Sequence, residues 1–556
     1  MNMIDVELRK ALVKALRKAQ ERGELPQFEI PQDIPVERPR QDSMGDYATP
    51  ICMQLAKLAR MAPTKIAEVV ARHLPKLEAI GGVEVAHPGF INFGLSDAWL
   101  VSQVGVIRSA PDTYGDANLG HGRKVQVEYV STNPTGPLHI GSARNAALGD
   151  VLASILGAAG YNVQREYYVN DAGNQVRAFG LSLYARYAQA LGRDEAMPED
   201  GYQGQYLVEL GATVAREQGD RYLQLPRDEA ARQLGELGLR GFVDSAKEDL
   251  SLMGIHYDNW FSEQTLYANG QYERIMTILR EGGHLDFHDG AVWFKAQELG
   301  GGKDEVVVRS DGTPGYFASD IAYHYNKFVE RGFDWVIDVW GADHQGHAPR
   351  MRAMMKALGL DPNRLTLVLY QMATFRRGGE IVRLSKRTGD IITLREVLEE
   401  VGPDAMRFFL LSRSADSQMD FDIDLAKEQS DENPVYYVQY AHARISSILR
   451  FAGALDYSAG DVSLLTTGPE LALIRQMIRL PEVVRAAAST LSPHHLAYYA
   501  QDLATAFHSF YRDCRVVSSD PGDEPITKAR LKLVSACGIV LARTLHLMGM
   551  TAPEVM

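Results

Sequence analysis

The chain has 556 residues, a formal net charge of −13, and 46% hydrophobic against 23% charged residues. Its length predicts roughly three or four domains, and its composition excludes a disordered chain. The three cysteines are widely spaced and form no CxxC pattern, so neither a disulfide framework nor a structural zinc site is expected. No apolar run is long enough to span a bilayer, and the acidic balance neither favours nor excludes nucleic-acid binding through local basic surfaces.

Residues 1–110 are predicted to form a separate α+β domain. The first helical pattern is amphipathic and suits a helix docked on a core. Its acidic residues are atypical of a transit peptide, so we expect a cytoplasmic protein. A strand is predicted at 89–93, where Phe90 and Phe93 are expected in the core rather than on a base-stacking surface.

A nucleotide-binding turn is predicted after the strand pattern at 125–129. This strand runs into a turn rich in Asn, Pro and Gly, the tetrapeptide LHIG at 138–141, and a helical pattern from Ser142. Such a turn forms an anion site, because unpaired N–H groups and the helix dipole face the ligand. Gly141 lets a ring or phosphate approach the backbone, and His139 adds a side-chain donor. The alternative is that His139 only caps the turn.

Residues 111–394 have the alternating pattern of an α/β domain. A second strand is predicted at 163–169, and the strand–helix–strand order indicates a parallel sheet. Charged, helical residues near 190–290 interrupt this pattern and are predicted to be an insertion. The second half of the nucleotide fold is expected to resume at 305–308.

A strand at 335–340 is predicted to end in the polar segment GADHQGH, residues 341–347. Parallel α/β sheets bind ligands at the carboxyl ends of their strands, so this segment is expected beside the ligand. Its Asp and His side chains are of types that bind metals, but we expect no dedicated protein metal site.

Tyr316 and Asp320 are predicted to lie one turn apart on the same face of a helix. A carboxylate and a phenol at this spacing can hold a guanidinium, whose planar fork pairs with carboxylates. The alternative is that Asp320 only caps the helix.

The segment VRLSKRTG, residues 382–389, places three basic side chains beside Ser and Gly. Such a loop can surround a triphosphate, with Lys386 neutralising charge as pyrophosphate leaves. By itself the segment is equally typical of an exposed basic loop.

Residues 395–556 are predicted to form an all-α bundle, with clear helical periodicity at 497–512 and 531–547. Its arginines can contact phosphates and its exposed tyrosines can stack on bases. Most of its aromatic residues are nevertheless expected in the core.

These segments together resemble the class I aminoacyl-tRNA synthetases, and among them the arginyl family. The turn at 138–141 is similar to the HIGH motif, and RLSK at 383–386 is similar to the KMSK motif. The stretches GFINF, YYVNDAGNQ, GADHQG and ENPVYYVQYAHAR are similar to arginyl members. Two departures stand out: Ser142 replaces the second His of the first motif, and Arg383 and Leu384 replace Lys and Met of the second.

The resemblance implies a multidomain fold. Its parts would be an α+β N-terminal domain at 1–110 that contacts tRNA, a Rossmann-like α/β class I catalytic domain at 111–394 with a helical insertion near 190–290, and an all-α helical bundle at 395–556 that binds the anticodon.

The resemblance also implies roles for individual residues. His139 and Lys386 would be catalytic. ATP would contact Pro137, His139, Gly141, Ser142, Arg383, Ser385 and Lys386 in the two motifs. Arginine would contact Glu128, Asn133, Tyr316, Asp320 and Gln345, with Tyr316 and Asp320 on its side chain and Glu128 and Asn133 on its α-amino end.

The implied reaction activates L-arginine with ATP and Mg²⁺ to arginyl-adenylate and pyrophosphate, and then transfers arginine to the 3′-terminal ribose of tRNA(Arg) in translation. We expect a cytoplasmic monomer without membrane contact. One alternative is a different class I synthetase or a small-molecule nucleotidylyltransferase, which would share the turn. Another is a synthetase-like RNA-binding protein with a decayed site, an idea that Ser142 supports.

Replacement of Ser142 by His tests whether the departure in the first motif matters. Serine can donate a hydrogen bond but cannot carry the charge of a second histidine. We expect Ser142→His to change the rate of ATP–pyrophosphate exchange less than roughly tenfold, below the usual cost of losing one preorganised donor. A larger change would show that serine at this position alters the mechanism.

Overall fold

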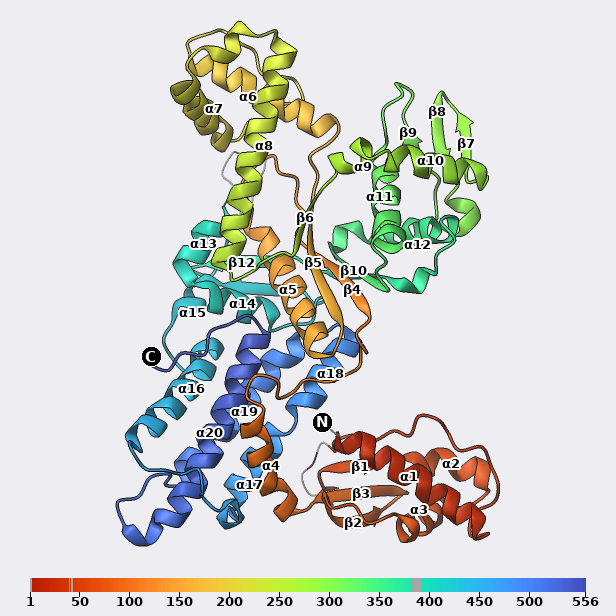
Figure 1. Cartoon of the computed structure of the whole chain (residues 1–556), viewed down its shortest axis with the longest axis vertical. Coiled ribbons are helices and arrows are strands. Elements are labelled where there is room, and N and C mark those ends of the chain that lie inside the picture. The colour runs from red at the N-terminus through yellow and green to blue at the C-terminus, as the bar shows by residue number, and fades with distance from the viewer. Residues whose placement is uncertain (1–2, 40, 42–43, 383–391) are drawn as a thin grey trace.

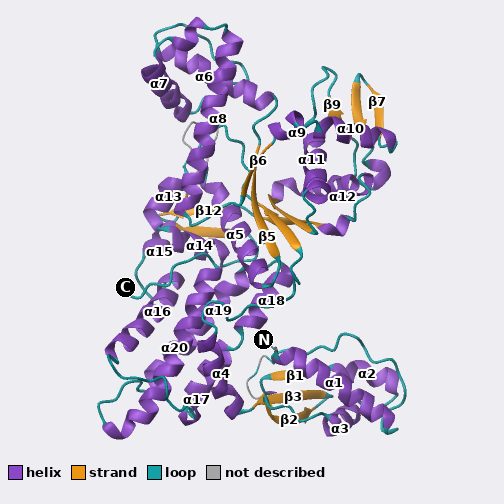
Figure 2. Cartoon of the chain, viewed as in Figure 1, coloured by secondary structure: helices purple, strands orange, loops and turns teal. Residues whose placement is uncertain are grey.

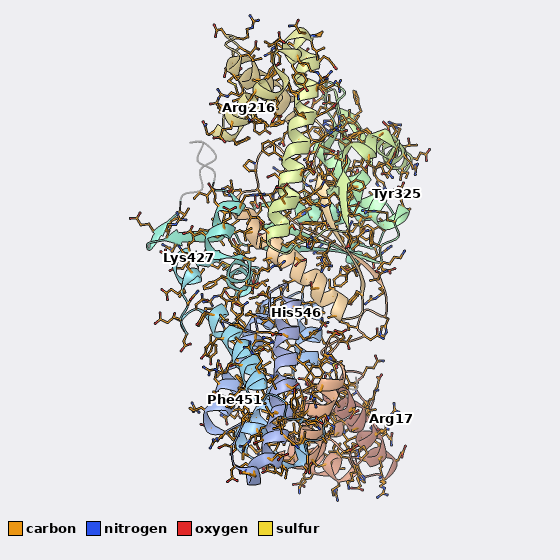
Figure 3. The ribbon with its side chains drawn as sticks, turned by 60° about the vertical axis from the view of Figure 1, so that its left-hand side comes forward. Arg17, Arg216, Tyr325, Lys427, Phe451 and His546 are labelled. Atoms are coloured by element: carbon orange, nitrogen blue, oxygen red, sulfur yellow. The ribbon has the colours of Figure 1, made fainter. Side chains whose placement is uncertain are left out.

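The computed structural model describes residues 3–39, 41, 44–382 and 392–556. The molecule is elongated, with a parallel sheet near its middle, a helical insertion at one end, and the helical bundle and N-terminal domain towards the other (Figure 1). Figure 3 shows a second side, with Arg216 of the insertion and Arg17 of the first helix at opposite ends. Within these described ranges, no helix has the length and apolar character needed to cross a membrane.

The N-terminal domain is a small antiparallel sheet covered by helices. Its elements are α1 (Ile4–Glu21), β1 (Tyr47–Thr49), α2 (Ile51–Ala59), α3 (Pro63–His73), β2 (Ile80–Ala86) and β3 (Phe90–Leu95), with strand order β1-β3-β2. The apolar face of α1 is buried and packs on α3. Phe93 is buried and Phe90 is partly buried. The next helix, α4 (Asp97–Ser109), packs on the C-terminal bundle instead.

The central sheet is fully parallel and places the site. Its strands are β4 (Lys124–Glu128), β5 (Asn162–Val169), β6 (Asn259–Ser262), β10 (Trp335–Gly341) and β11 (Leu365–Tyr370), in the order β11-β10-β4-β5-β6. Helix α5 (Ala143–Ala158) packs on one face, while α11 (Tyr316–Tyr325) and α12 (Ala348–Ala357) lie on the other (Figure 2). From β4 the chain passes to β5 on one side of β4, and it later returns to form β10 on the other side of β4. The strand order therefore reverses between β4 and β10.

Two insertions interrupt this sheet, whereas the sequence predicted only one. Between β5 and β6 lie the helices α6 (Asn174–Ala190), α7 (Gln205–Gln218) and α8 (Arg227–Leu252), and between β6 and β10 lie α9 (Gln264–Ala268), α10 (Gln271–Glu281), β7 (Leu285–His288), β8 (Ala291–Phe294) and β9 (Glu305–Val308). The expectation that the nucleotide fold resumes at 305–308 is wrong, because β9 pairs antiparallel with β8. A short apolar run does not by itself distinguish a parallel core strand from a hairpin strand.

A second small sheet follows the central one. Its strands are β12 (Ala373–Arg377), β13 (Glu380–Ile381) and β14 (Met419–Asp422), and between them lie α13 (Leu394–Val401) and α14 (Pro403–Leu411). After α15 (Ile423–Lys427), the bundle comprises α16 (Pro434–Phe451), α17 (Gly468–Met477), α18 (Leu480–Thr490), α19 (His494–Asp513) and α20 (Glu524–Leu547). The multidomain fold class expected from the sequence is confirmed.

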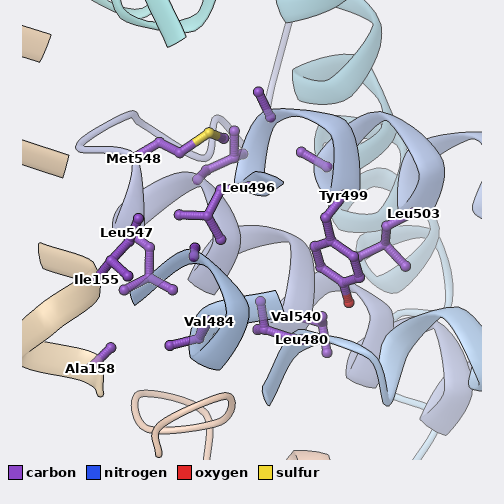
Figure 4. Close-up of a cluster of buried hydrophobic side chains, with 14 of the residues drawn as sticks. Ile155, Ala158, Leu480, Val484, Leu496, Tyr499, Leu503, Val540, Leu547 and Met548 are labelled. Atoms are coloured by element: carbon purple, nitrogen blue, oxygen red, sulfur yellow. The ribbon is translucent and has the colours of Figure 1, made fainter. Parts of the chain in front are cut away.

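The bundle is joined to the catalytic domain by a continuous apolar core. Ile155 and Ala158 of α5 approach Val484 of α18, Leu496 of α19 and Leu547 of α20, as Figure 4 shows. The helical bundle therefore packs against α5, the helix that follows the predicted nucleotide turn.

Arg407 of α14 ties three elements together within this core. Its side chain is fully buried, and its Nη2 donates to Asp150 Oδ2 of α5 at 2.8 Å. Its Nε donates to the carbonyl of Met253 beyond α8 at 2.6 Å, and its Nη1 to the carbonyl of Met548 beyond α20 at 3.0 Å. One guanidinium thus links the nucleotide-turn helix, the insertion and the bundle.

Replacement of Arg407 by Ala should destabilise the chain by about 3–5 kcal/mol, because it leaves buried acceptors and part of a buried ion pair without a partner. Thermal unfolding of the full chain measures this effect. Arg512→Ala, which removes an exposed arginine paired with Asp513, is the control. Similar unfolding temperatures for the two variants would contradict the role given to Arg407.

Candidate active site

The site lies where the strand order reverses, because neighbouring strands there lead their loops away in opposite directions and open a crevice. Asn145 of α5 holds this point together. Its Oδ1 accepts from Val130 N, just beyond β4, at 2.7 Å, and its Nδ2 donates to the carbonyl of Val339 in β10 at 2.9 Å. Sequence patterns could not single out Asn145, because its hydrogen bond to Val339 joins residues that are 194 positions apart.

The backbone immediately after β4 is strained. Val130 and Ser131 have φ values of 67° and 42°, in the left-handed region that a β-branched residue rarely adopts. Hydrogen bonds hold this conformation: Asn145 accepts from Val130 N, and Ser131 Oγ accepts from Tyr168 N at 3.1 Å. Strain of this kind concentrates at ligand sites, where the surrounding structure imposes it.

The predicted nucleotide turn forms a short 3₁₀ turn, η2 (Ile140–Ser142), before α5. His139 Nδ1 accepts from Gly141 N at 2.9 Å, so the ring carries its proton on Nε2 when it is neutral. A Cβ on Gly141 would lie 2.9 Å from both His139 Nδ1 and Met372 Cε, so only glycine fits there without displacement. Pro137 is half-buried, and the Ser142 side chain makes no capping hydrogen bond to α5.

The second motif falls in the range 383–391, so Arg383, Ser385 and Lys386 lie outside the described residues. The residues that follow this range are bonded to the first motif. Ile140 N donates to the carbonyl of Ile392 at 3.1 Å, and Leu394 N donates to the carbonyl of Leu138 at 2.8 Å. The structure therefore brings the downstream end of one motif beside the other.

Glu128, the last residue of β4, and Asp338, in the middle of β10, are direct register partners, and Lys327 bonds both. Its Nζ donates to Glu128 Oε2 at 2.6 Å and to Asp338 Oδ1 at 2.9 Å, and its side chain is fully buried. Burial alone would raise the pKa of Asp338, but the charges and hydrogen bonds of Lys327 and His324 together outweigh it and lower this pKa to about 2. Burial raises the pKa of Glu128 despite the same ammonium.

A second buried pair supports the same face of the sheet. Arg331 Nη2 donates to Glu166 Oε1 of β5 at 2.8 Å, and Tyr323 Oη donates to that oxygen at 2.5 Å. Asn259 Nδ2 donates to the other oxygen, Oε2, at 2.7 Å. Glu166 is thus satisfied from three sides.

Tyr316 and Asp320 lie one turn apart in α11, as the spacing predicts. Tyr316 is 54% exposed, and its ring lies 5.1 Å from the guanidinium of Arg309. Asp320 is half-buried, and burial raises its pKa. Within the described part of the chain, no hydrogen bond reaches its carboxylate oxygens; only its backbone carbonyl accepts, from His324 Nδ1 at 2.7 Å.

Glu263 is a carboxyl group in the site that sequence analysis missed. It is only 6% exposed, and burial raises its pKa to about 7 even though the nearby Ser319 hydroxyl favours the ionised form. Burial, and after it the charges of Glu263, Asp320 and Glu128, raise the pKa of Tyr168, so these carboxyls surround one phenol. Glu263 follows β6, a strand too short to be recognised in the sequence.

The remaining predicted arginine ligands lie on exposed loops. Asn133 is exposed and donates from Nδ2 to Gln175 Oε1 of α6 at 2.7 Å. Gln345 is exposed in η6 (Ala342–His347), directly after β10. Both follow strands whose carboxyl ends flank the crevice.

The chain matches three family models in order. Residues 6–95 match the arginyl tRNA synthetase N terminal domain, residues 106–202 and 240–428 match the catalytic domain of class I (R) tRNA synthetases, and residues 438–556 match the DALR anticodon binding domain. The chain belongs to the arginyl-tRNA synthetase family. As a member of this family it ligates arginine to tRNA, in a reaction that uses ATP.

The sequence is similar to arginine–tRNA ligases along its whole length. An arginine–tRNA ligase of Dehalococcoides mccartyi (strain CBDB1) is 55% identical over 548 residues, which cover 98% of each chain. That of Caldanaerobacter subterraneus subsp. tengcongensis is 50% identical and covers 99% of this chain and 98% of its own. The structure of Thermus thermophilus arginyl-tRNA synthetase superposes with a TM-score of 0.75 at 25% identity and covers 100% of both chains.

Replacement of His139 by Ala should cost about 2.5 to 4 kcal/mol of transition-state stabilisation, the range for one preorganised donor at a developing charge. ATP–pyrophosphate exchange with saturating arginine measures this loss. His256→Ala, which removes an exposed histidine, controls for the substitution itself. An exchange rate close to that of the unaltered chain would refute a catalytic role for His139.

Proposed function

We propose that this arginine–tRNA ligase binds the side chain of its substrate at Asp320, Glu263 and Tyr316. Support comes chiefly from Asp320, a half-buried carboxylate whose oxygens accept no hydrogen bond from the described residues. A carboxylate in this state has two acceptors ready for a planar donor fork. Tyr316 begins the same helix and adds a phenol at its exposed end.

The charge of these carboxyl groups favours a substrate that carries two cationic groups. Glu128 and Asp338 share the ammonium of Lys327, whereas the carboxyls of Asp320 and Glu263 lie, with that of Glu128, close enough to Tyr168 to add to burial in raising the pKa of its phenol. The excess negative charge suits a ligand with both an α-ammonium and a guanidinium, because each charged donor then meets a desolvated carboxylate. A neutral amino acid would leave that excess uncompensated.

The α-amino end is assigned to Glu128, Asn133 and Gln345. Glu128 has one oxygen bonded to Lys327, and no described residue donates a hydrogen bond to the other, which is therefore available as an acceptor. Asn133 and Gln345 are exposed beside the carboxyl ends of β4 and β10, where parallel sheets bind ligands.

ATP is assigned to the two motifs. Pro137, His139, Gly141 and Ser142 form the turn before α5, where Gly141 leaves room for the base or ribose and the helix N-terminus faces phosphate. Arg383, Ser385 and Lys386 would meet the triphosphate from the adjoining loop, a proposal supported by the bonds of Ile392 and Leu394 to the first motif. Mg²⁺ carried by ATP would neutralise part of the triphosphate charge.

In the first step, a carboxylate oxygen of arginine attacks the α-phosphorus, the bond to the bridging oxygen breaks, and pyrophosphate leaves with the electron pair. His139 Nε2 donates to the transferring phosphate, and Lys386 stabilises the leaving pyrophosphate. In the second step, a terminal ribose hydroxyl of tRNA(Arg) attacks the adenylate carbonyl, and AMP leaves. The enzyme is proposed to act as a cytoplasmic monomer.

ATP–pyrophosphate exchange with each amino acid, with and without total bacterial tRNA, tests this assignment. Among the amino acids, only arginine is expected to support exchange. Exchange with another amino acid would refute the assignment of Tyr316, Asp320 and Glu263. Absence of exchange in a folded chain that still binds tRNA would instead support a decayed site.

Arginine binding should strengthen as the pH rises from 6 to 8. Glu263, with a pKa of about 7, is mostly protonated at pH 6 and mostly a carboxylate at pH 8, so the KM for arginine should fall roughly tenfold across this range. Glu263→Gln should remove this dependence, whereas Glu273→Gln, at an exposed carboxylate of α10, should retain it. An unchanged pH profile in Glu263→Gln would contradict contact between Glu263 and the guanidinium.

A further inference from the structure

The helical insertion α6–α8 is a separately packed unit that nevertheless touches the active site. It has its own apolar cluster, which includes Phe179, Leu183, Leu207 and Leu234 and is distinct from the core under the central sheet. The catalytic family model matches residues 106–202 and 240–428, so residues 203–239, with α7 and the first half of α8, fall outside it.

Tyr206, in this unmatched part, reaches back to the turn between β4 and His139. Its Oη donates to the carbonyl of Thr135 at 2.9 Å. Its ring lies against Gly136, where an added Cβ would be 3.2 Å from the ring carbon Cζ. Thr135 and Gly136 stand between Asn133 and Pro137, which are assigned to arginine and ATP.

The side chain of Tyr206 is itself packed within the insertion. The ring of Phe242 in α8 packs edge-on against it, with centroids 5.7 Å apart. Gly204 leaves space for the ring, since a Cβ there would lie 2.3 Å from it. A shift of α7 or α8 would therefore move the phenol and the turn that it contacts.

Other contacts brace the same region from the insertion. Gln175, near the start of α6, accepts from Asn133 Nδ2 at 2.7 Å. At the far end of α8, Arg395 of α13 donates to Asp249 at 2.6 Å and to Glu248 at 3.0 Å. Leu394, beside Arg395, bonds the carbonyl of Leu138. The insertion thus contacts the turn directly, through Gln175 and Asn133, and indirectly through α13.

We propose that Tyr206 is a positioning residue through which the helical insertion sets the geometry of residues 131–137, and with it the binding of arginine. The strained backbone at Val130 and Ser131 needs such external support, because its conformation is unfavourable alone. This inference rests on the proposed function for Asn133.

The test compares Tyr206→Phe with Tyr187→Phe. Tyr187 Oη donates to the carbonyl of Gly219 at 2.6 Å and accepts from Tyr222 N at 3.2 Å, both within the insertion, so its variant loses at least as much hydrogen bonding without touching the turn. Tyr206→Phe should lower kcat/KM for arginine roughly three- to tenfold, the loss expected for one neutral hydrogen bond. The change should lie in KM, and Tyr187→Phe should leave kcat/KM within twofold.

Amide hydrogen exchange of the ligand-free full chain provides a readout that does not depend on activity. Peptides that cover residues 129–138 should exchange faster in Tyr206→Phe than in Tyr187→Phe. Equal exchange in the two variants would overturn the proposal, as would an equal loss of kcat/KM in both.

A double-mutant cycle then tests the route of the coupling. If Tyr206 acts through the turn, its effect on the KM for arginine should be smaller in an Asn133→Ala background than in the unaltered chain. Fully additive effects would refute this route. Failure of the unaltered chain to exchange with arginine would count against the proposed function instead, while the amide-exchange comparison would still decide the role of Tyr206.

Discussion

The buried ammonium of Lys327 is the constraint on which the site depends. Glu128 and Asp338 face each other on neighbouring strands, and two carboxylates at that separation repel unless a cation lies between them. Lys327 extends from η5 (Asn326–Glu330), the π-helical turn that continues α11. The ion pair therefore fixes where α11 lies along the sheet, and with it the positions of Tyr316 at the start of this helix and Asp320 one turn later.

Charge and strain are concentrated at the same edge of the sheet. Carboxyl groups outnumber cations around Tyr168, and the chain leaves β4 in a conformation unfavourable for valine. Both features cost stability in isolation, since buried carboxylates and left-handed residues require compensation. Here the compensation comes from Lys327, from Asn145, and from the insertion through Tyr206. These elements derive from distant parts of the chain, so the site is a property of the assembled domain.

Local patterns predicted the parts of the site that depend on sequence neighbours. The turn with His139 and Gly141 follows from a strand, a glycine-containing turn and a helix in succession, and the face shared by Tyr316 and Asp320 follows from helical periodicity. Glu263 was missed because β6 is four residues long and sits within what otherwise appears as one insertion. Its surroundings exist only after β6 pairs with β5.

The sequence alone determined the family, the three-part organisation and the types of residue available for binding ATP and a cationic amino acid, since these depend on local motifs and their order along the chain. Only the tertiary structure decided which carboxyls are paired with a buried cation and which are not. Glu128 and Asp338 share Lys327, Glu166 is paired with Arg331, and no described residue donates a hydrogen bond to the carboxylate oxygens of Asp320. The reason is physical: the pairing of a buried charge depends on what packs against it, and packing joins residues that sequence separation does not relate.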